Sequence, residues 1–479
     1  MSRPFLFGTD GWRGVIADDF NFTAVRTVAD AIGRYFAGEQ PGGRIYVGHD
    51  TRFQSDAFAQ QAAAVLARHG FEVAIPPGPV PSPLVSYTVK TDALRAGVMT
   101  TASHNPARWN GIKVKAPFGG SAPPEVTAQI AALANERRDT PPWPDALDAA
   151  GVPTWDAAPA YLARLRDLVD ADRLRGAGLH IVCDFMHGAG AGFLDRLLTD
   201  LGCAVTPVRA ERNPGFGGVN PEPIAQNLGV SLPLTRDPTV HAGFALDGDA
   251  DRLGVMAHGE FVDPHRVLAL LTVHLVEQRG WTGELARTVS TTQMLDRLGE
   301  HYGLPVHETP VGFKHIAQLM LERPIILGGE ESGGIGIGRH IPERDALYAA
   351  LLFAEMLAVS GETVAQRLEH LWSVLGATYY FRRIDLTVTD AQRDRLAEHL
   401  RAHPPTAVGS YPLARVDQRD GTKCYLERGG WVLIRPSGTE PLVRTYAEAT
   451  DPTVVDDLLA AATALVHATD TPPRTTSGA

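Results

Sequence analysis

The sequence has very few cysteines, three in 479 residues, at Cys183, Cys203 and Cys424. Three widely separated cysteines are too few for a disulfide framework or a zinc site built from thiolates. Proteins of reducing compartments show this kind of cysteine usage. Functions that depend on a disulfide-bonded scaffold or on a cysteine-zinc centre are therefore excluded.

Long apolar runs are also absent, so the sequence offers no segment that would span a bilayer. The N-terminus, MSRPFLFGTDGWRG, has no extended apolar core and is interrupted by glycine, which argues against a signal peptide. Basic residues are outnumbered by acidic ones, 44 to 55, and the formal charge is −11. Such a field does not attract nucleic acid or an anionic membrane. We expect a cytoplasmic monomer or homodimer that binds neither.

Short apolar strands alternate with helices along most of the chain. Arg44–Val47 is typical of a buried strand, Ser55–His69 has helix composition closed by Gly70, and Phe71–Ile75 is a second strand. A strand, a helix and a strand at this spacing predict a βαβ unit with a largely parallel sheet. At roughly 150 residues per domain, the length allows three or four domains.

The pattern continues and then changes near the C-terminus. Leu179–Cys183 and His241–Leu246 are predicted strands of a second unit, and Met294–Tyr302 is a predicted helix of a third. We expect Asp345–Ser360 to be a strongly amphipathic helix. Around Thr378–Asp385 aromatic and β-branched residues alternate, so a different kind of domain is predicted to begin there.

A hydroxyl-rich turn follows the apolar strand Ala96–Met99 and holds Ser103. Ligands bind at the carboxyl ends of strands in open α/β sheets. Ten residues further on, Lys113 lies on a short strand, on the face opposite Ile112. A serine needs a base or a metal to react, and a lysine can act as general acid and base. His104 cannot form a hydrolase pair with Ser103, because adjacent side chains point apart. In isolation the stretch is better explained as a polar turn before an edge strand.

Three aspartates, Asp247, Asp249 and Asp251, follow the strand that ends at Leu246. Alternation on an extended loop puts them on one side, where they repel each other unless a hard divalent cation lies among them. A calcium loop of the EF-hand type would need glycine and an acidic residue where Arg252 and His258 stand. We therefore predict a divalent-metal site that is not an EF-hand.

Two further loops combine polar side chains with glycine. Gly328–Gly334 offers Glu330 and Ser332 as hydrogen-bonding groups for sugar hydroxyls, and it is neither a Walker loop nor a GxSxG elbow. Arg435–Pro441, followed by Arg444, combines arginines with serine, glycine and threonine, which suits an oxyanion. Taken alone, the second loop is also compatible with an ordinary hairpin.

These four loops occur in an order that resembles the α-D-phosphohexomutase superfamily across about residues 7–449. TASHNP resembles the family's phosphoserine loop, DGDADR its metal loop, GEESG its sugar loop and RPSGTEP its phosphate loop. The resemblance implies an α/β, four-domain, heart-shaped architecture around a central cleft, with three related α/β domains and a smaller C-terminal α+β domain. The expected ranges are 1–145, 146–256, 257–371 and 378–468 for the domains and 469–479 for a disordered tail.

The resemblance also assigns roles to individual residues. It implies that Ser103 is phosphorylated and binds Mg²⁺ through its phosphate, together with Asp247, Asp249 and Asp251. It implies that Lys113 is the general acid/base. The remaining residues are implied to support the transfer (His104, Arg252 and Arg13), to bind the sugar (Glu330, Ser332 and Lys314) and to hold the phosphate that does not react (Arg435, Ser437, Gly438, Thr439 and Arg444).

The activity implied by the resemblance is interconversion of hexose 1- and 6-phosphates through a bisphosphorylated hexose, with Mg²⁺ and a hexose 1,6-bisphosphate activator. The TASHNP, TPVGFK and GEESG motifs are more similar to the phosphoglucomutase branch, so glucose phosphates are expected. Phosphomannomutase or dual activity is the alternative, followed by phosphoglucosamine mutase. A phosphatase would not need a second phosphate loop, and a silent sugar-phosphate sensor would not need Ser103, Lys113 and all three aspartates.

Overall fold

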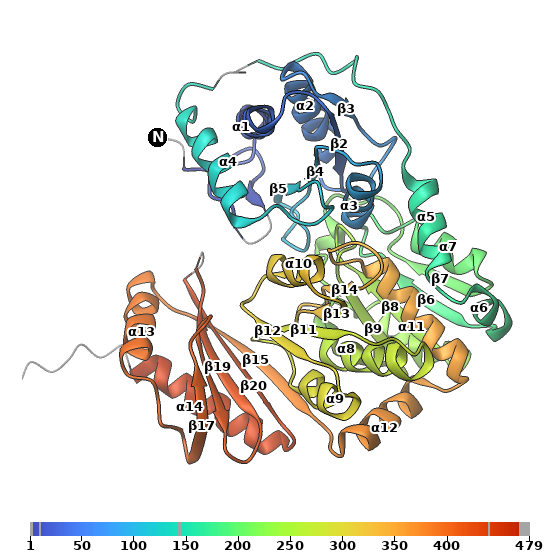
Figure 1. Cartoon of the computed structure of the whole chain (residues 1–479), viewed down its shortest axis with the longest axis vertical. Coiled ribbons are helices and arrows are strands. Elements are labelled where there is room, and N and C mark those ends of the chain that lie inside the picture. Colours follow the sequence, from blue (N-terminus) through green and yellow to red (C-terminus); the bar gives the residue numbers. More distant parts are fainter. Residues whose placement is uncertain (1–2, 9–10, 142, 144, 439–440, 469–479) are drawn as a thin grey trace, which may run out of the picture. The chain divides into compact units, whose positions relative to one another are not determined.

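The computed structural model describes residues 3–8, 11–141, 143, 145–438 and 441–468. By contacts between residues, the chain divides into two compact units (Figure 1). Unit 1 comprises residues 1–286 and 312–368, and unit 2 comprises residues 287–311 and 369–479. The predicted disordered tail, 469–479, lies outside the described residues.

The first sheet of unit 1 has the strand order β1-β5-β4-β2-β3. β2 is parallel to both β3 and β4, which confirms the predicted βαβ unit, and β5 is antiparallel to β1 and β4. The glycines of FGTDGWRG, residues 7–14, favour a loop around Arg13, but Arg13 lies within strand β1. The elements are β1 (Trp12–Val15), α1 (Phe22–Glu39), β2 (Arg44–His49), α2 (Ser55–Arg68), β3 (Glu72–Ala74), α3 (Ser82–Thr91), β4 (Ala96–Thr100), β5 (Trp109–Lys115) and α4 (Pro124–Glu136).

The second sheet of unit 1 has the order β10-β9-β8-β6-β7. Its central strands are parallel, since β6 pairs in parallel with β7 and β8, whereas β9 is antiparallel to β8 and to β10. The elements are α5 (Ala158–Asp167), α6 (Ala171–Ala177), β6 (His180–Asp184), α7 (Leu194–Asp200), β7 (Ala204–Val208), β8 (Ala242–Leu246), β9 (Leu253–Ala257), β10 (Glu260–Val262) and α8 (Pro264–Val273).

A third sheet has the order β12-β11-β13-β14, and the boundary between the two units passes through β11 (Glu284–Thr288). Unit 2 contains α9 (Met294–Tyr302) and β12 (Val306–Thr309). The elements of this region in unit 1 are α10 (Phe313–Glu322), β13 (Ile325–Gly329), β14 (Ile335–Ile337) and α11 (Ala346–Ser360). α12 (Val364–Leu375) crosses the boundary between Leu368 and Glu369.

The prediction that Asp345–Ser360 is strongly amphipathic is wrong. Every residue of α11 from Ala346 to Leu357 is buried, so the helix has no polar face toward solvent. A helix that is apolar all round belongs in the centre of a large core. Among the described residues no single helix could cross a membrane, and only α11 and α12 together, bent by 88°, have the required length and composition.

Unit 2 is built on a six-stranded sheet, β15-β20-β19-β18-β17-β16, whose pairs are all antiparallel. Its first strand, β15, begins at Tyr380, close to the position near Thr378 where the sequence pattern changes. The elements are β15 (Tyr380–Thr387), α13 (Asp390–Ala402), β16 (Ala407–Val408), β17 (Tyr411–Asp417), β18 (Thr422–Leu426), β19 (Trp431–Pro436), β20 (Leu442–Ala449) and α14 (Pro452–Ala468).

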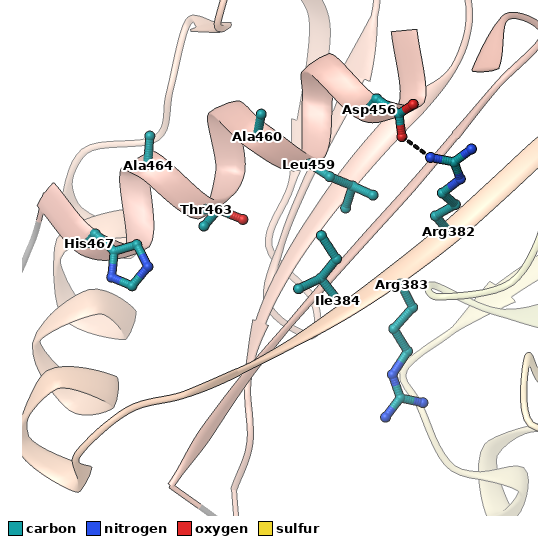
Figure 2. Close-up of a pocket in the computed structure, with 9 residues that line it drawn as sticks. All are labelled: Arg382, Arg383, Ile384, Asp456, Leu459, Ala460, Thr463, Ala464 and His467. Atoms are coloured by element: carbon teal, nitrogen blue, oxygen red, sulfur yellow. Dashed lines mark hydrogen bonds and ion pairs between the residues drawn. The ribbon is translucent and has the colours of Figure 1, made fainter. Parts of the chain in front are cut away.

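A groove of about 650 Å³ lies between β15 and α14 in unit 2. Figure 2 shows Ile384 and Leu459 along it, and Arg382 paired with Asp456 at one end. None of the residues predicted to bind substrate lines this groove.

Candidate active site

Ser103 lies in the turn after β4, and its side chain is directed at the aspartate loop. Its Oγ donates a hydrogen bond to Asp247 Oδ2 at 2.7 Å, although the two residues are 144 positions apart. Ser103 is only 1% exposed. The end of β4 therefore meets the end of β8, so the first and second sheets bring two of the four predicted loops together.

The three aspartates form a compact buried cluster. One carboxylate oxygen of each of Asp247, Asp249 and Asp251 lies within 4.8 Å of the others. Asp247 Oδ1 accepts hydrogen bonds from the backbone amides of Asp251 and Arg252, which fixes the loop. Burial, together with the charges of Asp251 and Asp249, raises the pKa of Asp247 well above its ordinary value. The predicted one-sided arrangement of these carboxylates is confirmed.

Close packing of the aspartate loop against the serine loop depends on Gly248. A Cβ atom at this position would lie 2.5 Å from the carbonyl oxygen of Ser103, which is shorter than a van der Waals contact. Glycine allows this approach because it has no side chain. Any other residue would push the aspartates away from the serine.

Lys113 joins the same cluster from β5. Its ammonium group lies 2.9 Å from Asp249 Oδ2 and 3.0 Å from Asp251 Oδ2, and its side chain is 2% exposed. Ile112 and Val114 belong to the apolar core on the other face of β5, as the alternation predicted. Because β5 is flanked by β1 and β4, it is not an edge strand. The cluster therefore combines a hydroxyl, three carboxylates and an amine.

The cluster fits a hard divalent cation such as Mg²⁺. Its donors are carboxylate oxygens, the ligand type that such ions prefer. Asp249 Oδ1 is buried and has no hydrogen-bond partner among the described residues, so this oxygen is available to a bound cation. Ser103, Asp247, Asp249 and Asp251 are the residues that would hold the ion.

The three residues expected to support the transfer, Arg13, His104 and Arg252, lie on or beside the serine and aspartate loops. Arg13 donates to Asn105 Oδ1 at 2.6 Å, which ties β1 to the serine turn. Arg252 Nε lies 3.9 Å from Asp251 Oδ1. The Nδ1 atom of His104 is buried, and burial followed by the charges of Arg252 and Arg13 lowers the pKa of His104 well below its ordinary value. His104 is therefore a neutral hydrogen-bonding group at neutral pH.

The predicted sugar loop is connected to the metal loop. Arg252 and Gly334 form an antiparallel backbone bridge, and the Leu253 amide donates to the Gly333 carbonyl at 3.0 Å. Glu330 is 5% exposed, and burial raises its pKa to about 7 although the nearby Arg344 opposes the shift. Ser332 is half-buried on the same loop, and Lys314 is half-buried in the first turn of α10.

Sequence reasoning missed Arg344, which links the two loops. Its guanidinium lies 2.9 Å from Asp251 Oδ2 and 3.3 Å from Glu330 Oε2. The adjacent Glu343 pairs with Lys115 at 2.7 Å. No local pattern marks Arg344, since it precedes α11 rather than following a strand. Only the fold brings it to the site.

The predicted phosphate loop belongs to unit 2. Arg435, the penultimate residue of β19, pairs with Arg444 on β20, and its Nε donates to Asp420 Oδ1 at 2.8 Å. Ser437 is buried, and a Cβ atom at Gly438 would meet nothing within 4 Å. Arg444 Nε lies 3.7 Å from Asp385 Oδ2. Thr439 lies outside the described residues.

Comparison with known proteins gives one consistent result. Four families match in sequence order: the phosphoglucomutase/phosphomannomutase α/β/α domains I, II and III at residues 4–140, 159–260 and 263–375, and the C-terminal domain at residues 387–465. This succession confirms the predicted four-domain phosphohexomutase architecture.

Relatives of nearly full length carry different substrate names. A phosphoglucosamine mutase of Frankia alni is 32% identical, with 98% of this chain and 99% of the relative covered. A phosphoglucomutase/phosphomannomutase of Thermococcus kodakarensis is 29% identical, with 93% and 94% covered. A crystal structure of a Thermus thermophilus protein assigned as a phosphomannomutase is 39% identical, with 98% and 100% covered and a TM-score of 0.85. The chain is an enzyme of the phosphohexomutase type and belongs to the α-D-phosphohexomutase superfamily.

Proposed function

We propose that the protein interconverts glucose 1-phosphate and glucose 6-phosphate through a phosphoserine at Ser103 and a bisphosphorylated hexose. The observation that carries the proposal is the buried hydrogen bond of 2.7 Å between Ser103 Oγ and Asp247, with Lys113 paired to the other two aspartates. Phosphoryl transfer depends mainly on positioning and on neutralising oxygen charge. This cluster supplies both conditions around one hydroxyl group.

Each residue then has a role. Bound at the aspartates, Mg²⁺ would neutralise phosphoserine oxygens and make Ser103 a better leaving group. Between Asp249 and Asp251, the amine form of Lys113 takes the proton of the sugar hydroxyl at its Nζ when that oxygen attacks the phosphate. The resulting ammonium returns the proton to the sugar oxygen when the phosphate moves back to Ser103. His104, Arg13 and Arg252 hold phosphate oxygens at the serine loop.

The other two loops hold the rest of the substrate. Glu330 and Ser332, assisted by Lys314, bind sugar hydroxyls, and the phosphate loop binds the phosphate that does not react. Because the bisphosphorylated intermediate must turn over, both loops accept the sugar in two orientations. A hexose 1,6-bisphosphate activator would phosphorylate Ser103 at the start. The residues of the phosphate loop in this proposal are Arg435, Ser437, Gly438, Thr439 and Arg444.

The identity of the sugar is the more specific part of the proposal. The names of the relatives favour two alternatives, since one at 39% identity is assigned as a phosphomannomutase and one at 32% is a phosphoglucosamine mutase. Steady-state kcat/KM for the 1-phosphates of glucose, mannose and glucosamine, each with Mg²⁺ and its own bisphosphate, separates the three.

A clear preference for glucose 1-phosphate is the expected result. Equal values for glucose and mannose would mean that Glu330 and Ser332 bind only hydroxyls that both sugars share. A preference for glucosamine would overturn the glucose assignment. Ser103→Ala is the control, and inorganic phosphate release in place of isomerisation would contradict a mutase.

A further inference from the structure

The backbone of Ser103 has a conformation that serine does not hold by itself. Its φ is +52°, in the left-handed region that favours glycine. Both backbone polar atoms are bound by side chains: the amide donates to Thr101 Oγ1 at 2.8 Å, and the carbonyl accepts from Arg52 Nη2 at 2.6 Å. Neighbouring side chains therefore hold the reacting residue in place.

One guanidinium group holds the whole serine loop. Besides Ser103, Arg52 donates to the carbonyl oxygens of Asn105 at 2.7 Å and of Pro106 and Trp109 at 3.0 Å each. Four carbonyl groups spread over residues 103–109 thus converge on one side chain. Only arginine offers enough donors in a rigid plane for such a set, whereas lysine carries a single ammonium group.

Asp50 fixes both Arg52 and Thr101. Its Oδ2 lies 3.2 Å from Arg52 Nε and accepts a hydrogen bond of 2.6 Å from Thr101 Oγ1, and its Oδ1 accepts one of 2.7 Å from Ser55 Oγ. The side chains of Asp50 and Arg52 are both 0% exposed. The ring of Phe216 lies 4.9 Å from the guanidinium carbon. Asp50, Arg52 and Thr101, which we call the serine clamp, form a closed buried arrangement.

We propose that the serine clamp positions Ser103 Oγ for phosphoryl transfer. The inference rests on the proposed role of Ser103. Arg52 and Asp50 act through the loop, so they are positioning residues. Displacing a reacting atom by about 1 Å lowers the rate by about 100-fold.

The test replaces Arg52 with lysine, which keeps the positive charge and removes the planar guanidinium group. The matched control is Arg209→Lys, because Arg209 pairs with Asp184 (2.8 Å) at the end of β6, and none of its hydrogen bonds reported in the structure reaches the serine loop. Two quantities are measured: kcat and KM for hexose phosphate, and the rate at which glucose 1,6-bisphosphate phosphorylates dephosphorylated Ser103, followed by intact mass.

Arg52→Lys is expected to lower kcat and the phosphorylation rate by about 100-fold, with KM changed by less than about threefold. Arg209→Lys is expected to retain both rates within about threefold even where its melting temperature falls. Asp50→Asn gives a second test of the clamp, with a loss of about 10-fold because Arg52 keeps its carbonyl partners.

Three results would overturn the serine clamp: unchanged rates in Arg52→Lys, unchanged rates in Asp50→Asn, or equal losses in Arg52→Lys and Arg209→Lys. Failure of the proposed function looks different, since the wild-type protein itself would then not take up phosphate on Ser103.

Discussion

Removal of one charge from the aspartate cluster should stabilise the metal-free protein and abolish its activity. The perturbation is Asp247→Asn, which keeps an oxygen for the amides of Asp251 and Arg252 and leaves an amide group facing Ser103 Oγ. It changes charge with little change in shape. The free energy of unfolding then reports the electrostatic cost of assembling the cluster without a cation.

The magnitude follows from the spacing of the carboxylates. Two unit charges 4.8 Å apart repel by about 3.5 kcal/mol at an effective dielectric constant of about 20. Asp247 has two such neighbours, while Lys113, Arg252 and Arg344 offset much of the repulsion. We expect a net gain of about 2 kcal/mol in the free energy of unfolding of metal-free Asp247→Asn.

Urea denaturation in EDTA and again in Mg²⁺ measures the change in the free energy of unfolding, and steady-state kcat with hexose phosphate and Mg²⁺ measures the loss of activity. Mg²⁺ at about 100 times its Kd should stabilise the wild-type protein by about 2.7 kcal/mol, and the variant should gain much less. The control is Asp184→Asn, because Asp184 is a buried aspartate already compensated by Arg209. Breaking that pair should destabilise the protein by about 3 kcal/mol. Equal destabilisation of metal-free protein by both substitutions would refute the reasoning.

Three other predictions concern single charged residues. Lys113→Met should lower kcat by about 100-fold or more with little change in KM, since it removes the proposed proton donor; a KM effect alone in steady-state kinetics would contradict this role. Because burial raises the pKa of Glu330 to about 7, its protonated form is favoured in the fold, and the free energy of unfolding should fall as pH rises from about 5 to about 7. Glu330→Gln should flatten that slope in denaturation experiments and raise KM, and an unchanged slope would refute the assignment. Burial acts against the charged form of Glu308, but Arg287 and Lys423 hold its pKa at about 2. Glu308→Gln should therefore cost about 3 kcal/mol at pH 7 and progressively less as pH falls below about 4.5; a cost that does not change with pH would contradict this role of Glu308.

Local sequence patterns predicted the strands that precede the active-site loops. An apolar run followed by a polar, glycine-rich turn is compatible with few structures other than a buried strand that ends in a loop. The aspartate triad was predictable for the same reason, since alternation along one loop decides which side chains point together. The proximity of Ser103 and Asp247 was expected only from the resemblance to the phosphohexomutases, because no local pattern in either loop indicates a contact with the other loop.

Residues that act through long-range contacts could not be predicted. Arg52 follows β2 in an ordinary-looking GHDTR turn, and its four carbonyl partners lie more than fifty positions away. α11 was misjudged because its few polar residues look like one face of an amphipathic helix, whereas Glu355 is buried and paired with Arg279 and His274. Partners supplied by the fold make such polar residues compatible with a core.

The central claim is that Ser103 carries the transferred phosphate, and intact-mass measurement after incubation with glucose 1,6-bisphosphate and Mg²⁺ tests it most directly. The account predicts one phosphate per chain, located on Ser103 by peptide mapping, lost on adding excess hexose monophosphate, and absent from Ser103→Ala. A wild-type protein that isomerises hexose phosphates without carrying phosphate on Ser103, or a Ser103→Ala variant with wild-type activity, would contradict it.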